Sequence, residues 1–145
     1  MPPKVLLAQT SAADRAETEL ALNSLGWEVW TTTNAKEACE LAKTSSFEFV
    51  LLDLVLEDGD GYTVARTIRE AEGGTNRCCI VAIGTLGPDE DQACLNSGMD
   101  GVINSTCNQE ELKAQLQKWI ARLAFKMWKT EGMPRLTLDR MWMGQ

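Results

Sequence analysis

The sequence predicts a single α/β domain in which a parallel sheet is covered by helices on both faces. Five short apolar or strand-forming segments alternate with five segments of helical periodicity, and this alternation is typical of right-handed strand–helix–strand units. The central segment, residues 49–52, is a continuous apolar run, as in a strand buried on both faces. It ends at Asp53, and open α/β sheets place functional groups at the carboxyl ends of their strands. The alternative for Asp53 is a structural role in capping the following turn.

The predicted strands share apolar runs or an alternating pattern of polar and apolar residues. In chain order they are residues 5–8, 27–31, 49–52, 79–83 and 101–104. The second alternates in polarity, so we place it near an edge of the sheet. The first, third and fourth are apolar throughout, which favours buried positions in the sheet.

The predicted helices begin and end at residues with known capping preferences. Gly26 ends the first helix, and Asn34 caps the second. Pro88, followed by three acids, begins the fourth, because proline suits the first helical position and acids suit the helix dipole there. Asn108 caps the long last helix. The predicted helices are residues 12–25, 35–43, 62–71, 88–97 and 109–123.

Composition limits the class of protein. The chain has 145 residues and a net charge of −7, and its negative charge argues against a nucleic-acid partner, which usually binds a basic face. No apolar run approaches the roughly 20 residues of a membrane span, and no secretory signal begins the chain. We therefore expect a cytoplasmic protein with neither a membrane nor a nucleic-acid partner.

Five cysteines and the absence of histidine restrict the chemistry. No pair of cysteines has the spacing of a zinc or redox motif. Without histidine there are no imidazole metal ligands and no histidine-activated nucleophiles. We interpret the cysteines as reduced thiols that pack as small apolar side chains.

The ordered strand–helix units resemble the receiver domain of two-component response regulators. The segment from Phe49 to Gly61, with Asp53 closing a strand and Asp60 preceding Gly61, matches that family's third-strand motif in spacing. Residues 98–102 match the segment leading into its fifth strand. The resemblance covers residues 4–123 and implies a flavodoxin-like (βα)5 doubly wound sheet of strand order 2-1-3-4-5. We assign residues 1–128 to this receiver-like domain and residues 129–145 to an irregular C-terminal tail containing Met and Trp.

Within that resemblance, Asp53 takes the place of the aspartate that accepts a phosphoryl group from a kinase histidine. The family's acidic pair after the first strand holds Mg²⁺, and here those positions are Gln9 and Thr10. Mg²⁺ needs hard oxygen ligands and usually carboxylate charge, so we predict no bound Mg²⁺, no other cofactor and a stability independent of Mg²⁺. Glu57 or Asp58 would replace the lost acids only if the turn after the third strand folded inward.

Three further family positions differ. The Ser or Thr that binds the phosphoryl oxygens after the fourth strand is Gly84 here, with Thr85 one place later. The Lys and Pro after the fifth strand are Ser105 and Thr106, and the aromatic position within that strand is Val102. Losing even one charge-stabilising donor commonly costs about 3 kcal/mol in a transition state. We therefore predict inefficient phosphoryl transfer and a hydrogen-bonded pocket that is satisfied without ions.

The resulting prediction is a pseudo-receiver: a non-enzymatic two-component signalling module that binds proteins such as a sensor kinase or a regulator. The family's usual contact surface spans the fourth helix, fifth strand and fifth helix, and its candidates here are Asp91, Leu95, Val102, Glu111 and Gln115. Trp128 and Trp142 either pack on the chain's own domain or form a partner or homodimer contact, because Met and aromatic residues are enriched in interfaces. Trp119 is expected in the core.

Two other functions stay open. The first is a receiver that still accepts a phosphoryl group at Asp53 with an atypical pocket. The second is a flavodoxin-like protein that binds a flavin or another small ligand. Residues 9–13 lack the glycines that bring backbone close to phosphate, although Thr10 and Ser11 supply hydroxyls. Absorbance of the purified protein would reveal a bound flavin.

Overall fold

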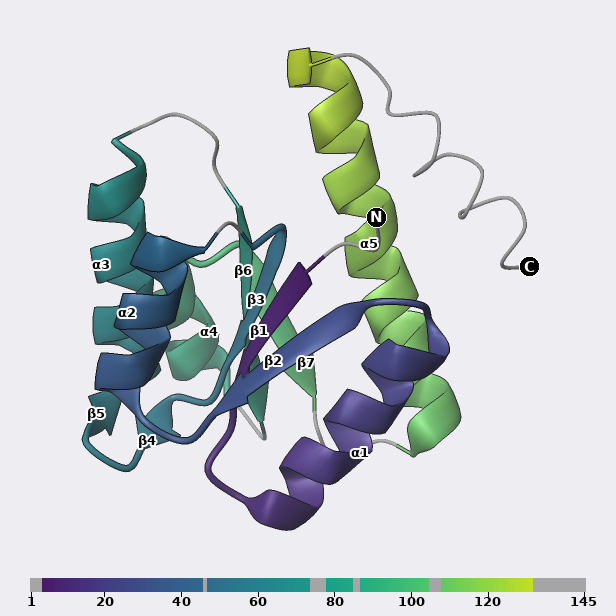
Figure 1. The fold of residues 1–145 in the computed structure, drawn as a ribbon, viewed down its shortest axis with the longest axis horizontal. Coiled ribbons are helices and arrows are strands. Elements are labelled where there is room, and N and C mark those ends of the chain that lie inside the picture. The colour runs from purple at the N-terminus through teal and green to yellow at the C-terminus, as the bar shows by residue number, and fades with distance from the viewer. Residues whose placement is uncertain (1–3, 46, 74–77, 85–86, 105–107, 132–145) are drawn as a thin grey trace.

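A computed structural model describes residues 4–45, 47–73, 78–84, 87–104 and 108–131. Within these ranges a five-stranded sheet lies between two layers of helices (Figure 1). The sheet strands are β1 (Lys4–Ala8), β2 (Glu28–Thr32), β3 (Phe49–Leu52), β6 (Cys79–Gly84) and β7 (Gly101–Asn104). The helices are α1 (Ala12–Ser24), α2 (Ala35–Thr44), α3 (Gly61–Glu72), α4 (Pro88–Asn96) and α5 (Gln109–Glu131).

The sheet confirms the predicted topology. Its order is β2-β1-β3-β6-β7 and every neighbouring pair is parallel, which is the 2-1-3-4-5 order in terms of the sheet strands. Leu7 of β1 pairs in register with Leu51 of β3, and Leu51 pairs with Val81 of β6. The carboxyl ends of the central strands therefore meet at one edge of the sheet.

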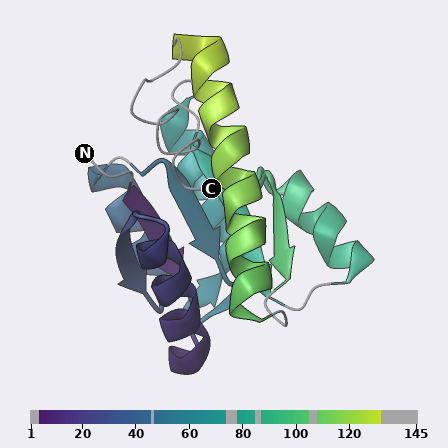
Figure 2. The same ribbon diagram turned by 90° about the vertical axis from the view of Figure 1, so that its right-hand side faces the viewer.

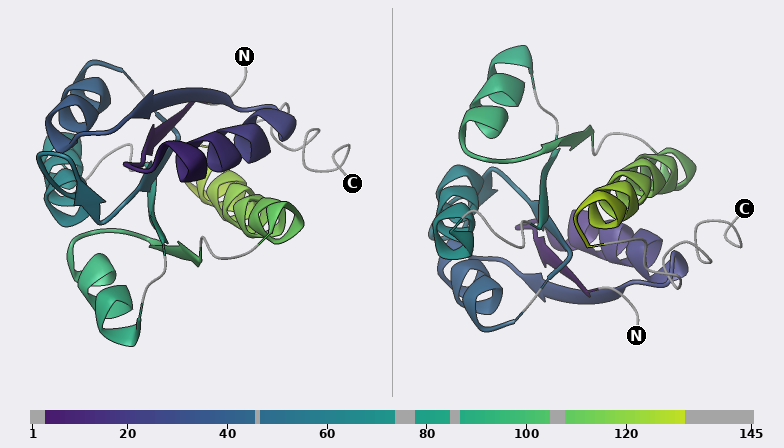
Figure 3. Two further views of the ribbon diagram at one scale, coloured as in Figure 1. Left: turned by 90° about the horizontal axis from the view of Figure 1, so that it is seen from below. Right: turned by 90° about the horizontal axis from the view of Figure 1, so that it is seen from above.

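Two apolar clusters fill the spaces between the sheet and its helices. Helices α2, α3 and α4 cover one face of the sheet, and α1 and α5 cover the other (Figure 3). Their buried side chains form one apolar cluster on each face. The fully buried Leu52 belongs to the first cluster, and its neighbour Leu51 belongs to the second. This alternation explains why β3 is apolar throughout, since each buried Leu contributes about 1.5–3 kcal/mol.

Helices α2 and α3 are each capped by a polar side chain at the residue before their first turn. Asn34 Oδ1 accepts the Glu37 N–H at 2.7 Å, as predicted for α2. Asp60 Oδ1 accepts the Thr63 N–H at 2.7 Å and caps α3. Gly73 ends α3 with a φ of 60°, a left-handed conformation that glycine adopts without strain.

The segment after β3 differs from the prediction. Its Gly and Asp residues predict a turn, whereas the chain forms a short antiparallel hairpin from β4 (Val55–Leu56) and β5 (Gly59–Asp60). Two-residue strands carry too little pattern to be distinguished from a turn, and Gly and Asp are turn residues.

The last helix continues further than the periodic pattern indicates. Figure 2 shows α5 as a long helix that runs through Glu131, into the segment predicted as tail. Trp119 is half-buried against the core cluster beneath α5, as expected for a core residue, and its ring lies beside Gly101. Trp128 belongs to α5, whereas Trp142 lies outside the described residues. None of the helices described is long and apolar enough to cross a membrane.

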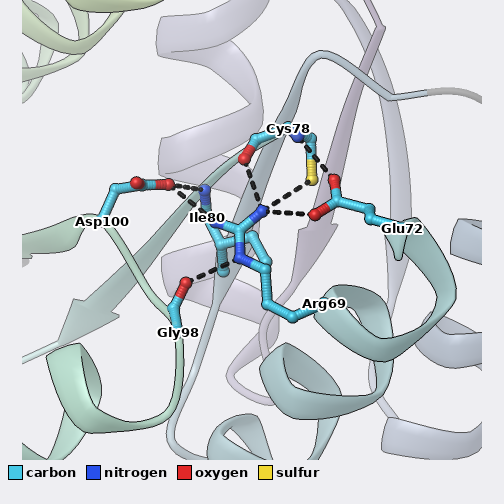
Figure 4. Close-up of polar contacts among 6 residues, drawn as sticks. All are labelled: Arg69, Glu72, Cys78, Ile80, Gly98 and Asp100. Carbon is cyan, nitrogen blue, oxygen red and sulfur yellow. Dashed lines mark hydrogen bonds and ion pairs between the residues drawn. The ribbon is translucent and has the colours of Figure 1, made fainter. Parts of the chain in front are cut away.

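A polar cluster centred on Arg69 of α3 fixes the opposite edge of the sheet, at the amino ends of β6 and β7 (Figure 4). The guanidinium contacts two carboxylates and two backbone carbonyls at 2.8–2.9 Å, namely those of Glu72, Asp100, Gly98 and Cys78. Asp100 also accepts the Ile80 N–H at 2.9 Å. Burial raises the pKa of the Cys78 thiol to about 12, so this cysteine is held as an unreactive thiol.

Candidate functional site

The candidate site lies where β1 and β3 end side by side. Asp53 directly follows β3, and its backbone N–H donates to Ala8 O at 2.8 Å. Leu7 and Leu51 are register partners, so Gln9 and Asp53, each two residues further along, are neighbours at the carboxyl edge. The structure thus brings together two of the predicted site residues.

Thr10 contacts both the Asp53 side chain and the backbone beyond it. Its N–H donates to Asp53 Oδ2 at 3.0 Å, and its hydroxyl donates to Val55 O at 2.9 Å. The Arg15 guanidinium of α1 donates to Gln9 O at 2.9 Å and to Thr10 O at 3.4 Å. The loop after β1 is therefore hydrogen-bonded to the residues that follow β3 and to the first turn of α1.

The Asp53 carboxyl is half-buried, and three effects act on its pKa. Burial raises the pKa most, the Thr10 N–H lowers it, and the nearby Asp14 carboxylate raises it again, for a net increase above 3.8. Asp14 lies in the first turn of α1. No sequence pattern singled out Asp14 or Arg15. Their place could have been inferred, because the helix that follows β1 must begin at the carboxyl edge where β1 ends.

Gln9 is buried, with 2% of its surface exposed. Its N–H donates to Thr32 O at 3.1 Å. Within the described part of the chain, its buried Oε1 has no hydrogen-bond partner. The expected pocket of satisfied polar groups is therefore only partly formed by the described residues, because Thr10 is paired and the side-chain Oε1 of Gln9 is not.

Glu57 and Asp58 point toward α2 rather than toward Asp53. The Asp58 carboxylate accepts the N–H groups of Ala35 and Lys36, at 2.5 and 3.2 Å, at the start of α2. Glu57 Oε1 accepts the Thr33 hydroxyl at 2.5 Å. The turn does not fold inward, so neither acid replaces a carboxylate at the candidate site.

Gly61 allows the close approach of α3 to the end of β3. A Cβ atom at Gly61 would lie 2.4 Å from the Asp53 carbonyl oxygen. Gly61 also donates its N–H to Leu54 O at 3.0 Å. Both residues of the predicted Asp60-Gly61 motif thus have a structural role, since Asp60 caps α3 and Gly61 leaves room for the backbone of Asp53.

The remaining pocket positions are only partly visible. Gly84 is the last residue of β6 and lies at the same carboxyl edge. Thr85, Ser105 and Thr106 lie outside the described residues. The structure therefore places Gln9, Thr10, Asp53 and Gly84 at this edge and says nothing of the other three.

The predicted contact surface surrounds β7, an edge strand that both α4 and α5 contact. On α4, Leu95 is 51% exposed, and Asp91 is half-buried with an Oδ1 atom that has no partner among the described residues. On α5, Glu111 is exposed and Gln115 is half-buried. Val102 of β7 is half-buried and packs against the core instead of standing free.

The geometry does not fit a bound Mg²⁺ ion. Across the described ranges, no three His, Cys, Asp or Glu side chains are placed to hold a metal. Mg²⁺ requires oxygen acceptors around it, whereas Asp53 Oδ2 and Val55 O already face the two donors of Thr10. At Asp53 the described residues therefore place a hydrogen-bond donor, the Thr10 N–H, against the carboxylate.

A flavodoxin-like sheet with an aspartate at the carboxyl end of its central strand is the arrangement expected of a receiver domain. Comparison with known proteins agrees, because the family model of the response regulator receiver domain matches residues 5–117. The chain therefore belongs to the response regulator receiver domain family.

Similar proteins include complete regulators and single receiver domains. The chain is 30% identical over 119 residues to the cell cycle response regulator CtrA of Brucella ovis, covering 82% of this chain and 50% of CtrA. The chain thus matches half the length of that relative.

Two solved structures show the same fold. The receiver domain of a sensor histidine kinase from Pseudomonas aeruginosa, which holds a magnesium ion in its active-site cleft, is 29% identical, with a TM-score of 0.73 and coverage of 83% of this chain and 99% of that chain. The signal receiver domain of a LuxO repressor protein from Vibrio parahaemolyticus has a TM-score of 0.78 at 16% identity, covering 90% of this chain and 98% of that chain.

Proposed function

We propose that this receiver domain is a pseudo-receiver, which signals through protein contacts and does not use the usual Mg²⁺-dependent phosphorylation. The observation that carries the proposal is the environment of Asp53. Its carboxylate accepts the Thr10 N–H, the Thr10 hydroxyl donates to the neighbouring Val55 O, and repulsion from Asp14 adds to the cost of negative charge at Asp53. Phosphoryl transfer to Asp53 would increase negative charge in a site without a described compensating cation.

Intact mass after incubation with Mg²⁺ and a small-molecule phosphodonor tests this proposal. We expect no added phosphoryl group on the wild-type protein or on the Asp53→Asn control. A gain of one phosphoryl group that disappears in Asp53→Asn would refute the pseudo-receiver and establish a receiver with an atypical pocket. Circular dichroism of both proteins checks that the fold is intact.

The proposed partner surface is the exposed face of α4 together with β7 and the start of α5. The first turn of α4 contains three acids, Asp89, Glu90 and Asp91, and Leu95 lies exposed one turn later. A protein that offers basic side chains around an apolar one fits this combination of charge and exposed Leu. Such a partner is a sensor kinase or a regulator of the same signalling system.

The other properties of the protein follow from the same proposal. A domain that acts by contact needs neither catalysis nor a cofactor, and it acts in the cytoplasm, where sensor kinases and regulators meet. Residues 1–128 are the signalling domain, and residues 129–145 with Trp128 and Trp142 supply a second contact or a homodimer. Sedimentation velocity of the full chain and of a chain ending at residue 131 would test the dimer.

A further inference from the structure

The β4–β5 hairpin, residues 55–60, is held by hydrogen bonds from the loop after β1 and from the start of α2. On one side, the Thr10 hydroxyl donates to Val55 O at the start of the hairpin. On the other side, Asp58 accepts two N–H groups from the start of α2. The hairpin follows Asp53 directly, so its position and that of the Asp53 carboxyl are fixed together.

Thr10 is itself held firmly enough to serve as an anchor. The Arg15 guanidinium binds the carbonyl groups of Gln9 and Thr10, and the buried Gln9 joins the loop to β2 through Thr32. Thr10 then presents one N–H and one O–H in the direction of Asp53 Oδ2 and Val55 O. These two oxygens, a carboxylate and a carbonyl, are of the type that a divalent cation would bring together.

We propose that Thr10 takes the structural place of a cation in this domain. Its backbone N–H binds Asp53 Oδ2 and its hydroxyl binds Val55 O of the hairpin, and together they keep the carboxyl edge in one arrangement without metal. The inference rests on the proposed metal-independent function and assigns that property to one residue. Thr10 is a positioning residue here, since it acts through Asp53 and the hairpin. It follows that a carboxylate at position 10 would keep the backbone N–H, replace the hydroxyl donor by acceptors and create with Asp53 an acid pair that attracts a divalent cation.

Amide hydrogen exchange of the full chain tests the positioning role. Thr10→Val keeps the shape of the side chain but removes the hydroxyl, and Thr10→Ser keeps the hydroxyl. In Thr10→Val we expect about fivefold faster exchange at Glu57 and Gly61, whose N–H groups bond to Thr33 O and Leu54 O, because about one net hydrogen bond is lost. Thr10→Ser should exchange like the wild-type protein.

Calorimetric titration with Mg²⁺ alone tests the second part of the proposal, that a carboxylate at position 10 creates a site for a divalent cation. We expect Thr10→Asp to bind Mg²⁺, and the matched Thr10→Asn to give no heat of binding, like the wild-type protein. Unchanged hairpin exchange in Thr10→Val, or no Mg²⁺ binding by Thr10→Asp, overturns the proposal. Phosphorylation of wild-type Asp53 would instead refute the proposed function and leave the exchange results as they are, so the two failures are distinguishable.

Discussion

The surroundings of the Asp53 carboxyl disfavour its charged form. Burial and the Asp14 carboxylate both raise its pKa, and the single N–H of Thr10 offsets them only in part. A carboxyl group that is more easily protonated is less suited to attract a cation. Burial and Asp14 thus both disfavour the charged form of Asp53 relative to an exposed aspartate.

The pH dependence of stability tests this description of Asp53. Because its folded-state pKa lies above 3.8, the stability associated with the protonated side chain is fully present below pH 3.8 and is lost as the pH rises through the raised pKa. Asp53→Asn stays neutral, so its free energy of unfolding should rise relative to that of the wild-type protein over this pH range and then level off. Urea unfolding at several pH values measures the difference.

Asp89→Asn, at an exposed carboxylate in the first turn of α4, controls for the loss of one negative charge. The same pH-dependent gain in Asp89→Asn would show that net charge, rather than the site, causes the effect. A free energy of unfolding of Asp53→Asn that falls relative to that of the wild-type protein as the pH rises would contradict the conclusion that burial raises the Asp53 pKa.

The place of Asp53 could be predicted because an apolar run that ends in a carboxylate is a local pattern. The contacts of Thr10 could not, since they join residues more than forty positions apart. The sequence indicates which residue types replace the family's acids, whereas only the structure reveals that one of them supplies two hydrogen bonds across the site.

At the scale of elements, Asp58 couples the hairpin to α2. The N–H groups of Ala35 and Lys36 lower the pKa of the Asp58 carboxyl, with Ala35 contributing most. The stabilisation by the charged form is therefore present above pH 3.8 and is lost as the pH falls through the lowered pKa.

Asp58→Asn should consequently lower the free energy of unfolding at neutral pH, because an amide oxygen accepts from the helix start more weakly than a carboxylate does. The difference from the wild-type protein should shrink as the pH falls below the lowered pKa. Urea unfolding between acidic and neutral pH measures it, and a difference that stays constant with pH would argue against the capping role.

The Arg69 cluster joins α3 to the starts of β6 and β7. Arg69→Met keeps much of the side-chain volume but leaves the partly buried Glu72 and Asp100 without their cation. We expect a loss of about 3 kcal/mol in the free energy of unfolding, at the low end for buried pairs because these side chains remain 13–21% exposed.

Arg66→Met, at an exposed position of the same helix, is the matched control and should change stability by less than about 0.5 kcal/mol. Chemical denaturation of the three proteins gives the comparison. Equal effects of the two substitutions would mean that the cluster contributes nothing beyond the helix itself.

Elements with long periodic patterns were predictable, and the shortest were not. The five sheet strands and the first four helices lie close to the predicted ranges, because burial on one or both faces leaves a repeated pattern, whereas α5 continues to Glu131, beyond its predicted end at residue 123. The β4–β5 hairpin has strands of two residues and depends on contacts to α2 and to Thr10. Its existence is a tertiary effect that local sequence does not encode.

For the whole molecule, the sheet order and the receiver family agree with the sequence-based prediction. Alternation of strands and helices indicates a parallel sheet, and the strand order is what the family resemblance implies, so neither needed side-chain detail. The chain matches only half the length of CtrA, and the signalling output of such longer regulators is not a property of the receiver fold. Contacts through α4, β7 and α5 are the output that we propose.

We propose above all that the carboxyl edge of this domain keeps one arrangement without a bound cation. Thermal unfolding of the wild-type protein, with millimolar Mg²⁺ and with a chelator, tests it most directly. We predict the same melting temperature in both conditions. A rise of about 5–10 °C with Mg²⁺, the shift expected from an ion present at a hundredfold excess over its Kd, would contradict the claim and make Asp53 part of a working metal site.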